Sequence, residues 1–145
     1  MMSRKIKNAA EPSRVSNATL RFHEFVTAGN ITAVKVALNA GNVAVDEPGP
    51  SGRTALHMAA DKSNIDVAKL LIEHGANVSA PGHHGRTPLH IAVSKGNEEM
   101  IQLLLTHHGA KVDPLDAFGV TPLHTAALLG MIAEMALLLS HGANV

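Results

Sequence analysis

The sequence predicts an all-α fold, a solenoid of stacked antiparallel helix pairs. The tetrapeptide Thr-Pro-Leu-His at 87–90 returns unchanged at 121–124, and as Thr-Ala-Leu-His at 54–57. Its histidine recurs at positions 57, 90 and 124, so the period is 33 or 34 residues. Internal periods of about 20–50 residues are typical of solenoids. Aromatic residues make up only 2% of the chain, so aliphatic side chains must supply the core.

The tetrapeptide predicts the start of a short first helix in each copy. Thr87 and Thr121 can accept a hydrogen bond from amides of the first helical turn that would otherwise lack a partner. Pro88 and Pro122 then occupy the first helical position, where a missing N–H costs nothing. Ala55 replaces this proline in its own copy, and we expect the helix to tolerate the change.

A more apolar second helix follows in each copy. In the segment 65–72, positions 65, 68, 71 and 72 fall on one helical face. Gly75 can adopt the left-handed conformation that ends such a helix. Neither helix has enough apolar area to fold alone, so neighbouring copies are expected to bury each other's faces.

On these motifs the chain resembles the ankyrin repeat family, from about Asn17 to its last residue. Phe22-His23 stands where later copies have Leu-His, which indicates a degenerate first copy that acts as the N-terminal cap. The resemblance implies an ankyrin-repeat solenoid with projecting β-hairpin or loop fingers between the helix pairs. The expected domain covers residues 18–145, with repeats at about 18–49, 50–82, 83–116 and 117–145.

Two departures from the family's pattern concern the fingers. The finger aspartate is present as Asp116 but replaced by Gly49 and Gly82 in the other copies, which predicts looser fingers there. Ser79 and Asp113 replace the usual asparagine at the end of a repeat. We therefore expect the bonds that this asparagine makes to come from other residues.

The head of the chain differs in composition from the repeats. Residues 1–17 carry a net charge of +3 and the repeats a net charge of −3. We predict that residues 1–17 form a disordered basic tail, and we favour a solvated leader over a contact with nucleic acid. The chain has no cysteine, no apolar run near the roughly 18 residues of a membrane span and no signal-peptide core. We expect no membrane attachment and a cytoplasmic location, with the nucleus as the alternative.

Ten histidines raise the question of a metal site. His57, His90 and His124 recur once per copy, and stacked helices lie about 8–10 Å apart. Zinc needs each nitrogen at about 2.0–2.1 Å, so these three cannot share one ion. The resemblance implies a structural role, in which each ring ties the turn before the first helix to neighbouring backbone. For the exposed pair His83-His84 we favour a partner contact over a weak surface metal site.

Catalysis finds no support in the motifs. The sequence has no cysteine, no G-x-S-x-G turn and no glycine-rich phosphate loop after a strand. We therefore expect no enzyme activity, no cofactor and no small-molecule substrate.

The resemblance implies that another protein binds to the fingertips and to the exposed part of the first helices. Polar residues at these positions dominate the earlier copies, and apolar residues dominate the last copy, where contiguous exposed apolar surface marks an interaction site. The alternative is that these apolar residues pack on a further repeat or on a second chain. The candidate partner-binding residues are Arg53, Asp61, Lys62, His83, His84, Arg86, Ser94, Lys95, Leu115, Phe118, Val120, Leu128 and Leu129.

The sequence thus favours a non-catalytic scaffold, adaptor or inhibitor. The runner-up is a regulatory segment of a larger enzyme or channel. The last copy has interior-like apolar residues, including Met131, Ile132 and Leu139, whereas terminal units of a solenoid need a polar outer face. We expect either that the protein continues beyond Val145 or that its last helix is covered, and we favour the first; self-association through the last repeat is one way to cover the helix.

Overall fold

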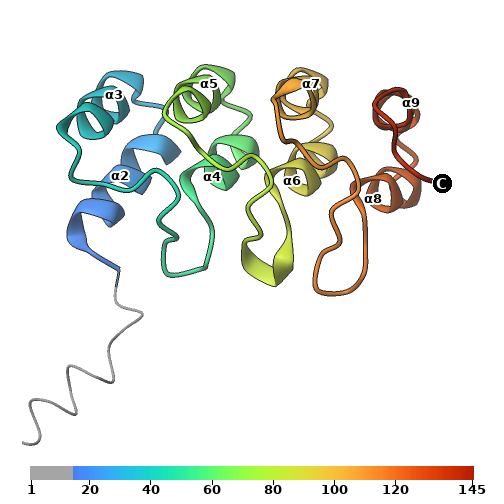
Figure 1. The fold of residues 1–145 in the computed structure, drawn as a ribbon, viewed down its shortest axis with the longest axis horizontal. Helices are drawn as coiled ribbons and strands as arrows, with labels where there is room; N and C mark the ends of the chain where they lie inside the picture. Colours follow the sequence, from blue (N-terminus) through green and yellow to red (C-terminus); the bar gives the residue numbers. More distant parts are fainter. Residues whose placement is uncertain (1–14) are drawn as a thin grey trace, which may run out of the picture.

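The fold is an extended stack of helix pairs, seen in a computed structural model that describes residues 15–145 (Figure 1). Second helices form the upper row in this view, first helices lie beneath them, and the loops between pairs project downward. The elements are α2 (Asn17–Thr27), α3 (Ile31–Ala40), α4 (Ala55–Asp61), α5 (Ile65–Glu73), the 3₁₀ turn η1 (His83–Gly85), α6 (Pro88–Lys95), α7 (Glu98–Thr106), α8 (Pro122–Leu128) and α9 (Ile132–Ser140).

Neighbouring pairs stack in chain order. Among the first helices, α4 packs between α2 and α6, and α6 between α4 and α8; α5 and α7 are flanked in the same way by second helices. The eight α-helices of residues 15–145 therefore confirm the predicted all-α stack.

The first helix of the stack includes residues that the sequence analysis placed in the tail, residues 1–17. Ser16 is the N-cap of α2, and its Oγ accepts a hydrogen bond from the amide of Thr19 at 3.1 Å. Ser16 and Asn17 thus belong to the first helix and its cap. Residues 1–14, which make up most of the predicted tail, lie outside the described residues.

From α3 to α8, asparagine and threonine are the N-cap residues in alternation, whereas Met131 precedes α9 and makes no side-chain cap. Thr87 and Thr121 are the N-caps of α6 and α8, each followed by proline at the first helical position, as the tetrapeptide predicts. The second helices begin at Asn30, Asn64 and Asn97, whose side chains accept from the backbone amide three residues on. The sequence analysis overlooked this second set of caps, although it repeats with the same period.

The core runs along the stack between the two rows. Ala68 and Leu71 of α5 are fully buried, as the one-face pattern predicts, but Val67 is fully buried and Leu70 nearly so. Ile65 and Ile72 of the predicted face are only half-buried. The buried face is thus displaced from the predicted one, because α5 contacts α3, α4 and α7. Because three sides of α5 are covered, only a narrow strip of this helix is exposed to solvent.

The fingers are loops, and no β-strand occurs between residues 15 and 145. One backbone hydrogen bond closes each finger: Gly49 N to Arg53 O at 3.0 Å, Gly82 N to Arg86 O at 2.8 Å and Asp116 N to Val120 O at 3.0 Å. The glycines thus preserve the closing bond. What Asp116 adds is a carboxylate oxygen that accepts from two further amides of its finger.

Adjacent repeats are also joined at the ends of their second helices. Ser79 Oγ accepts from the amide of Lys111 at 3.0 Å, and Asp113 Oδ2 accepts from the amide of Asn144 at 3.0 Å. Ser79 and Asp113 thus accept bonds from the next repeat themselves, because a hydroxyl or a carboxylate can accept from an amide as an asparagine carbonyl can.

Candidate functional site

Two buried histidines hold the fingers against the first helices. His57 Nδ1 accepts from the backbone amide of Thr54 at 3.0 Å, and its Nε2 lies 2.8 Å from the carbonyl oxygen of Arg86 in the next finger. A carbonyl can only accept, so Nε2 carries the proton and the ring is neutral. Burial lowers the pKa of His57 from its ordinary value, against the raising effect of the bond to Arg86.

His90 repeats the arrangement one copy later. Its Nδ1 accepts from the amide of Thr87 at 3.1 Å, and its Nε2 donates to the carbonyl oxygen of Val120 at 2.8 Å. Burial lowers the pKa of this ring too. Each such histidine spans two copies, so the position of a finger depends on the histidine of the preceding copy.

In the first and last copies, the histidine makes only one of these two kinds of hydrogen bond within residues 15–145. His124 Nδ1 accepts from the amide of Thr121 at 3.1 Å, but its side chain is exposed. His23 Nε2 donates to Glu47 O at 3.1 Å, and its buried Nδ1 has no partner within residues 15–145. In that copy the amide of Leu20 already donates to Ser16 O within α2.

A polar pocket of about 250 Å³ lies between the first two fingers and the first helices. We call it the finger pocket; its lining is Arg53, His57, Asp61, His83, His84, Arg86, Ile91 and Ser94. Fingers one and two supply the arginines and the exposed histidines, and α4 and α6 supply the floor. Because the histidine links fix both fingers, the pocket is preformed.

Charges in the finger pocket are unevenly paired. Asp61 Oδ1 lies 3.3 Å from Lys95 Nζ and 3.8 Å from Arg53 Nη2. In the part of the chain that the structure describes, no carboxylate lies within 4.0 Å of Arg86. Its Nη2 donates to the carbonyl oxygen of His90 at 3.4 Å. The pocket therefore keeps an excess of positive charge.

An apolar surface adjoins the pocket at the third finger. The ring centroids of His84 and Phe118 lie 5.6 Å apart, and the Phe118 side chain is 73% exposed. The amide of Ala117 donates to His84 O at 2.9 Å, which joins the second and third fingers directly. The polar pocket and the exposed phenyl ring thus form one continuous surface.

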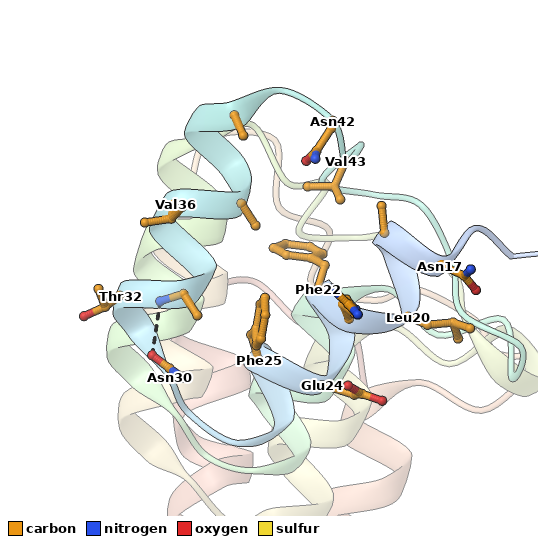
Figure 2. Close-up of a pocket in the computed structure, with 15 residues that line it drawn as sticks. Asn17, Leu20, Phe22, Glu24, Phe25, Asn30, Thr32, Val36, Asn42 and Val43 are labelled. Carbon is orange, nitrogen blue, oxygen red and sulfur yellow. Dashed lines mark hydrogen bonds between the residues drawn. The ribbon is translucent and has the colours of Figure 1, made fainter.

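A second, larger depression lies at the N-terminal end of the stack, between α2 and α3 (Figure 2). It has a volume of about 950 Å³ and a mostly apolar lining. Ala33 and Ala37 line it at the positions where α5 has Val67 and Leu71. These smaller side chains leave the hollow, and Val36 on its rim is 64% exposed. The sequence analysis missed this groove, although the alanines in register signal it.

Comparison with known proteins agrees with the repeat structure. A family model for "Ankyrin repeats (many copies)" matches residues 22–72 and 56–105, and one for "Ankyrin repeat" matches residues 118–145. The chain belongs to the ankyrin repeat family. A protein of Bos taurus, named "Ankyrin repeat, SAM and basic leucine zipper domain-containing protein 1", is 33% identical over 78 residues. These residues cover 54% of this chain but 16% of the relative.

The ankyrin fold brings most of the predicted partner-binding residues together. The finger pocket contains six of them, Lys95 joins through its ion pair with Asp61, and Phe118 joins through His84. Val120 is half-buried where the third finger closes. The remaining four are exposed but lie outside the pocket lining: Lys62, Leu115, Leu128 and Leu129. Sequence reasoning missed Ile91, which lines the pocket although it is 6% exposed.

Between residues 15 and 145, no three His, Cys, Asp or Glu side chains gather as metal ligands would. None of the helices in this part of the chain is long and apolar enough to cross a bilayer.

Proposed function

We propose that this chain is a non-catalytic recognition module that binds another protein with its fingers and first helices, as a scaffold, adaptor or inhibitor. Ankyrin repeats generally act as protein–protein interaction modules, and this chain has the repeats. The observation that carries the proposal is the continuous surface from the finger pocket to the exposed ring of Phe118.

The composition of this surface suits recognition. Exposed apolar side chains next to a polar pocket provide both an anchor and a means of orienting the partner. Leu115 and Phe118 are 65% and 73% exposed. Because His57 and His90 already hold the fingers by hydrogen bonds, binding should order few additional residues, which lowers its entropic cost.

The hydrogen bonds of His57 and His90 support a non-catalytic role for these two rings. A general base needs a free ring nitrogen within reach of its substrate. Both nitrogens of His57 and of His90 are engaged in hydrogen bonds to the chain itself. These rings therefore serve the fold, and the exposed pair His83-His84 is left for contact with a partner.

The proposal is tested by affinity capture with cross-linking, using the full chain as bait. The double variant F118S/L128S removes two exposed apolar side chains, 73% and 87% exposed, and should lose the partner that the wild type captures. V36S is the matched control, since Val36 is 64% exposed in the N-terminal groove, and it should retain the partner. Capture that survives F118S/L128S would contradict the proposal.

A regulatory segment of a larger enzyme or channel is the second candidate. The observation that bears on it is that the matched residues form 16% of the relative, whose name includes SAM and basic leucine zipper domains; this favours a segment of a larger protein, and the name mentions neither an enzyme nor a channel. Determining the complete reading frame and assaying the whole product with and without the repeats distinguishes the two candidates. A cytoplasmic location, with the nucleus as the alternative, is part of the proposal; the absence of cysteine fits a reducing compartment.

Self-association through the last repeat is a further part of the proposed partner set. Ile132 and Leu139 of α9 are 73% and 42% exposed, and contiguous exposed apolar surface favours association. Light scattering of the isolated chain over a range of concentrations tests this. A monomer at every concentration would remove self-association from the proposal.

A further inference from the structure

The finger pocket is a concentration of positive charge on an acidic domain. The chain from residue 15 onward has a net charge of −3. In the pocket, however, Arg53 and Lys95 lie within 4.0 Å of the Asp61 carboxylate, and Arg86 lines the same pocket. A cleft of one sign on a surface of the other attracts a complementary charge to that place alone. The charge distribution thus favours an acidic group on the partner.

We infer that the finger pocket binds a single carboxylate, the side chain of an aspartate or glutamate in an extended segment of the partner protein. This inference rests on the proposed function. An apolar residue of the same segment, about three positions away, lies against Phe118.

The size of the unpaired charge points to a monoanion. Asp61 offsets Lys95 and shares Arg53. Among residues 15–145, Arg86 has no carboxylate within 4.0 Å, and Asp116 of the third finger acts on it at longer range, so its guanidinium is the cation most open to a ligand. A guanidinium presents parallel N–H groups that match the two oxygens of a carboxylate. A dianion such as phosphate would meet one unpaired positive charge together with the repulsion of Asp61.

The hydrogen-bond donors that are available agree with this choice. Ser94 Oγ already donates to the carbonyl oxygen of Ile91 at 2.8 Å, so its hydroxyl proton is used. The guanidinium of Arg86 and the exposed ring nitrogens of His83 and His84 can still donate. The pocket therefore offers donors on the finger side, where a partner would approach.

The position of Phe118 sets the spacing. Its ring adjoins that of His84, at the border between the pocket and the third finger. Stacked helices lie about 8–10 Å apart. An extended segment in the polyproline II conformation advances about 3.1 Å per residue with three residues per turn, so side chains three positions apart face the same side. An acidic residue in the pocket therefore places the side chain about three residues away over the third finger.

The backbone of His84 offers a way to separate binding from folding. His84 has φ of 56°, in the left-handed region that favours glycine. Its carbonyl oxygen accepts from Ala117, so the strained conformation is held by the next finger. Replacing His84 with glycine keeps this conformation available and removes only the ring.

The test is a selection of displayed random 12-residue peptides on the full chain. Peptides retained by the wild type should be enriched in Asp or Glu with Leu, Ile, Val or Phe about three positions away. A selected peptide is then synthesised in three forms, with its acidic residue kept, changed to the amide, or replaced by phosphoserine. Binding is measured by fluorescence polarisation against the wild type, R86Q, H84G, F118S and K69Q.

The amide form of the peptide, or the R86Q variant, should weaken binding about tenfold, as loss of a charge-assisted hydrogen bond does. H84G should weaken binding without lowering the melting temperature. K69Q removes an exposed cation of α5 outside the pocket and should bind like the wild type. The phosphoserine form should bind less tightly than the carboxylate form.

Several outcomes would overturn the inference. Selected peptides without an excess of acidic residues, equal binding of the amide form, or full binding by R86Q would each do so, as would tighter binding of phosphoserine. If peptides depend on Phe118 but not on Arg86, the inference fails while the proposed function stands. If selection yields no peptide that depends on either residue, both fail.

Discussion

The Nε2 atom of His57 lies 2.8 Å from the carbonyl oxygen of Arg86. This bond fixes the second finger to the first helix of the preceding repeat. The side chain of the same Arg86 lines the finger pocket. The scaffold and the candidate site therefore share a residue, whose backbone serves stability and whose guanidinium serves recognition.

Replacing His57 with alanine should destabilise the chain by roughly 3 kcal/mol, because the buried amide of Thr54 and carbonyl of Arg86 lose their partner. The free energy of unfolding is measured by urea titration. H124A is the matched control, since His124 has the same place in its repeat but an exposed side chain. It should cost about 1 kcal/mol, the usual effect of losing a helix cap. Equal costs for the two variants would mean that the inter-repeat bond adds nothing.

Stability should fall as the pH drops below about 6.5, the ordinary pKa of histidine. Burial lowers the pKa of His23, His57 and His90 in the folded chain, so below pH 6.5 the unfolded chain binds more protons. Each ring then contributes a slope of up to about 1.4 kcal/mol per pH unit until its lowered folded pKa is reached. Above pH 6.5 this contribution is constant.

Urea titrations between pH 7.5 and pH 5 measure this slope, and the slope should be flatter in a chain that lacks His57.

The carboxyl group of Asp116 titrates at lower pH than these histidines. Hydrogen bonds from the amides of Val120 and Phe118 lower the pKa of its carboxyl group, so its contribution is present above about pH 3.8 and is lost as the pH falls through the lowered pKa. Stability that stays constant from pH 7.5 to pH 5 would contradict the assignment of neutral buried rings.

Replacing Ser63 with glycine should stabilise the chain by about 0.5–1 kcal/mol. Ser63 has φ of 54° at a position where the other copies have Gly29, Gly96 and Gly130, with φ of 67–71°. A side chain strains this conformation and glycine does not. The reciprocal control is G130A: a Cβ there meets no atom within 4 Å, so its expected loss of about 1 kcal/mol reports the backbone alone. Calorimetry should show a higher melting temperature for S63G and a lower one for G130A; the opposite order would refute the prediction.

Replacing Asp116 with alanine should loosen the third finger without unfolding the stack. Asp116 Oδ1 accepts from the amides of Phe118 at 2.9 Å and Val120 at 3.0 Å, and alanine accepts from neither. Amide hydrogen exchange should speed up at both residues. The second finger, which has Gly82 at this position, serves as the internal control and should exchange at its wild-type rate. Unchanged protection at Phe118 would show that the carboxylate does not brace the finger.

The local features of the repeats could be predicted because neighbouring residues determine them. Thr87 and Thr121 start helices through their own side chains, and Gly75 ends one through its own φ of 87°. Each of these effects acts within one turn of helix. The extent of burial could not be predicted in this way. Val67 is fully buried because a neighbouring repeat covers a side of α5 that its own periodicity leaves open.

For the candidate site too, some features follow from the sequence and others only from the tertiary structure. The repeat pattern by itself determined which residues stand on fingers and first helices, since period and register assign each position a place. Only the tertiary structure decided that Asp61 pairs with Lys95, that Arg86 has no carboxylate within 4.0 Å among residues 15–145, and that His84 adjoins Phe118. These relationships join residues about one repeat apart. They depend on how side chains converge across the stack, which is a matter of distance in space rather than of order along the chain.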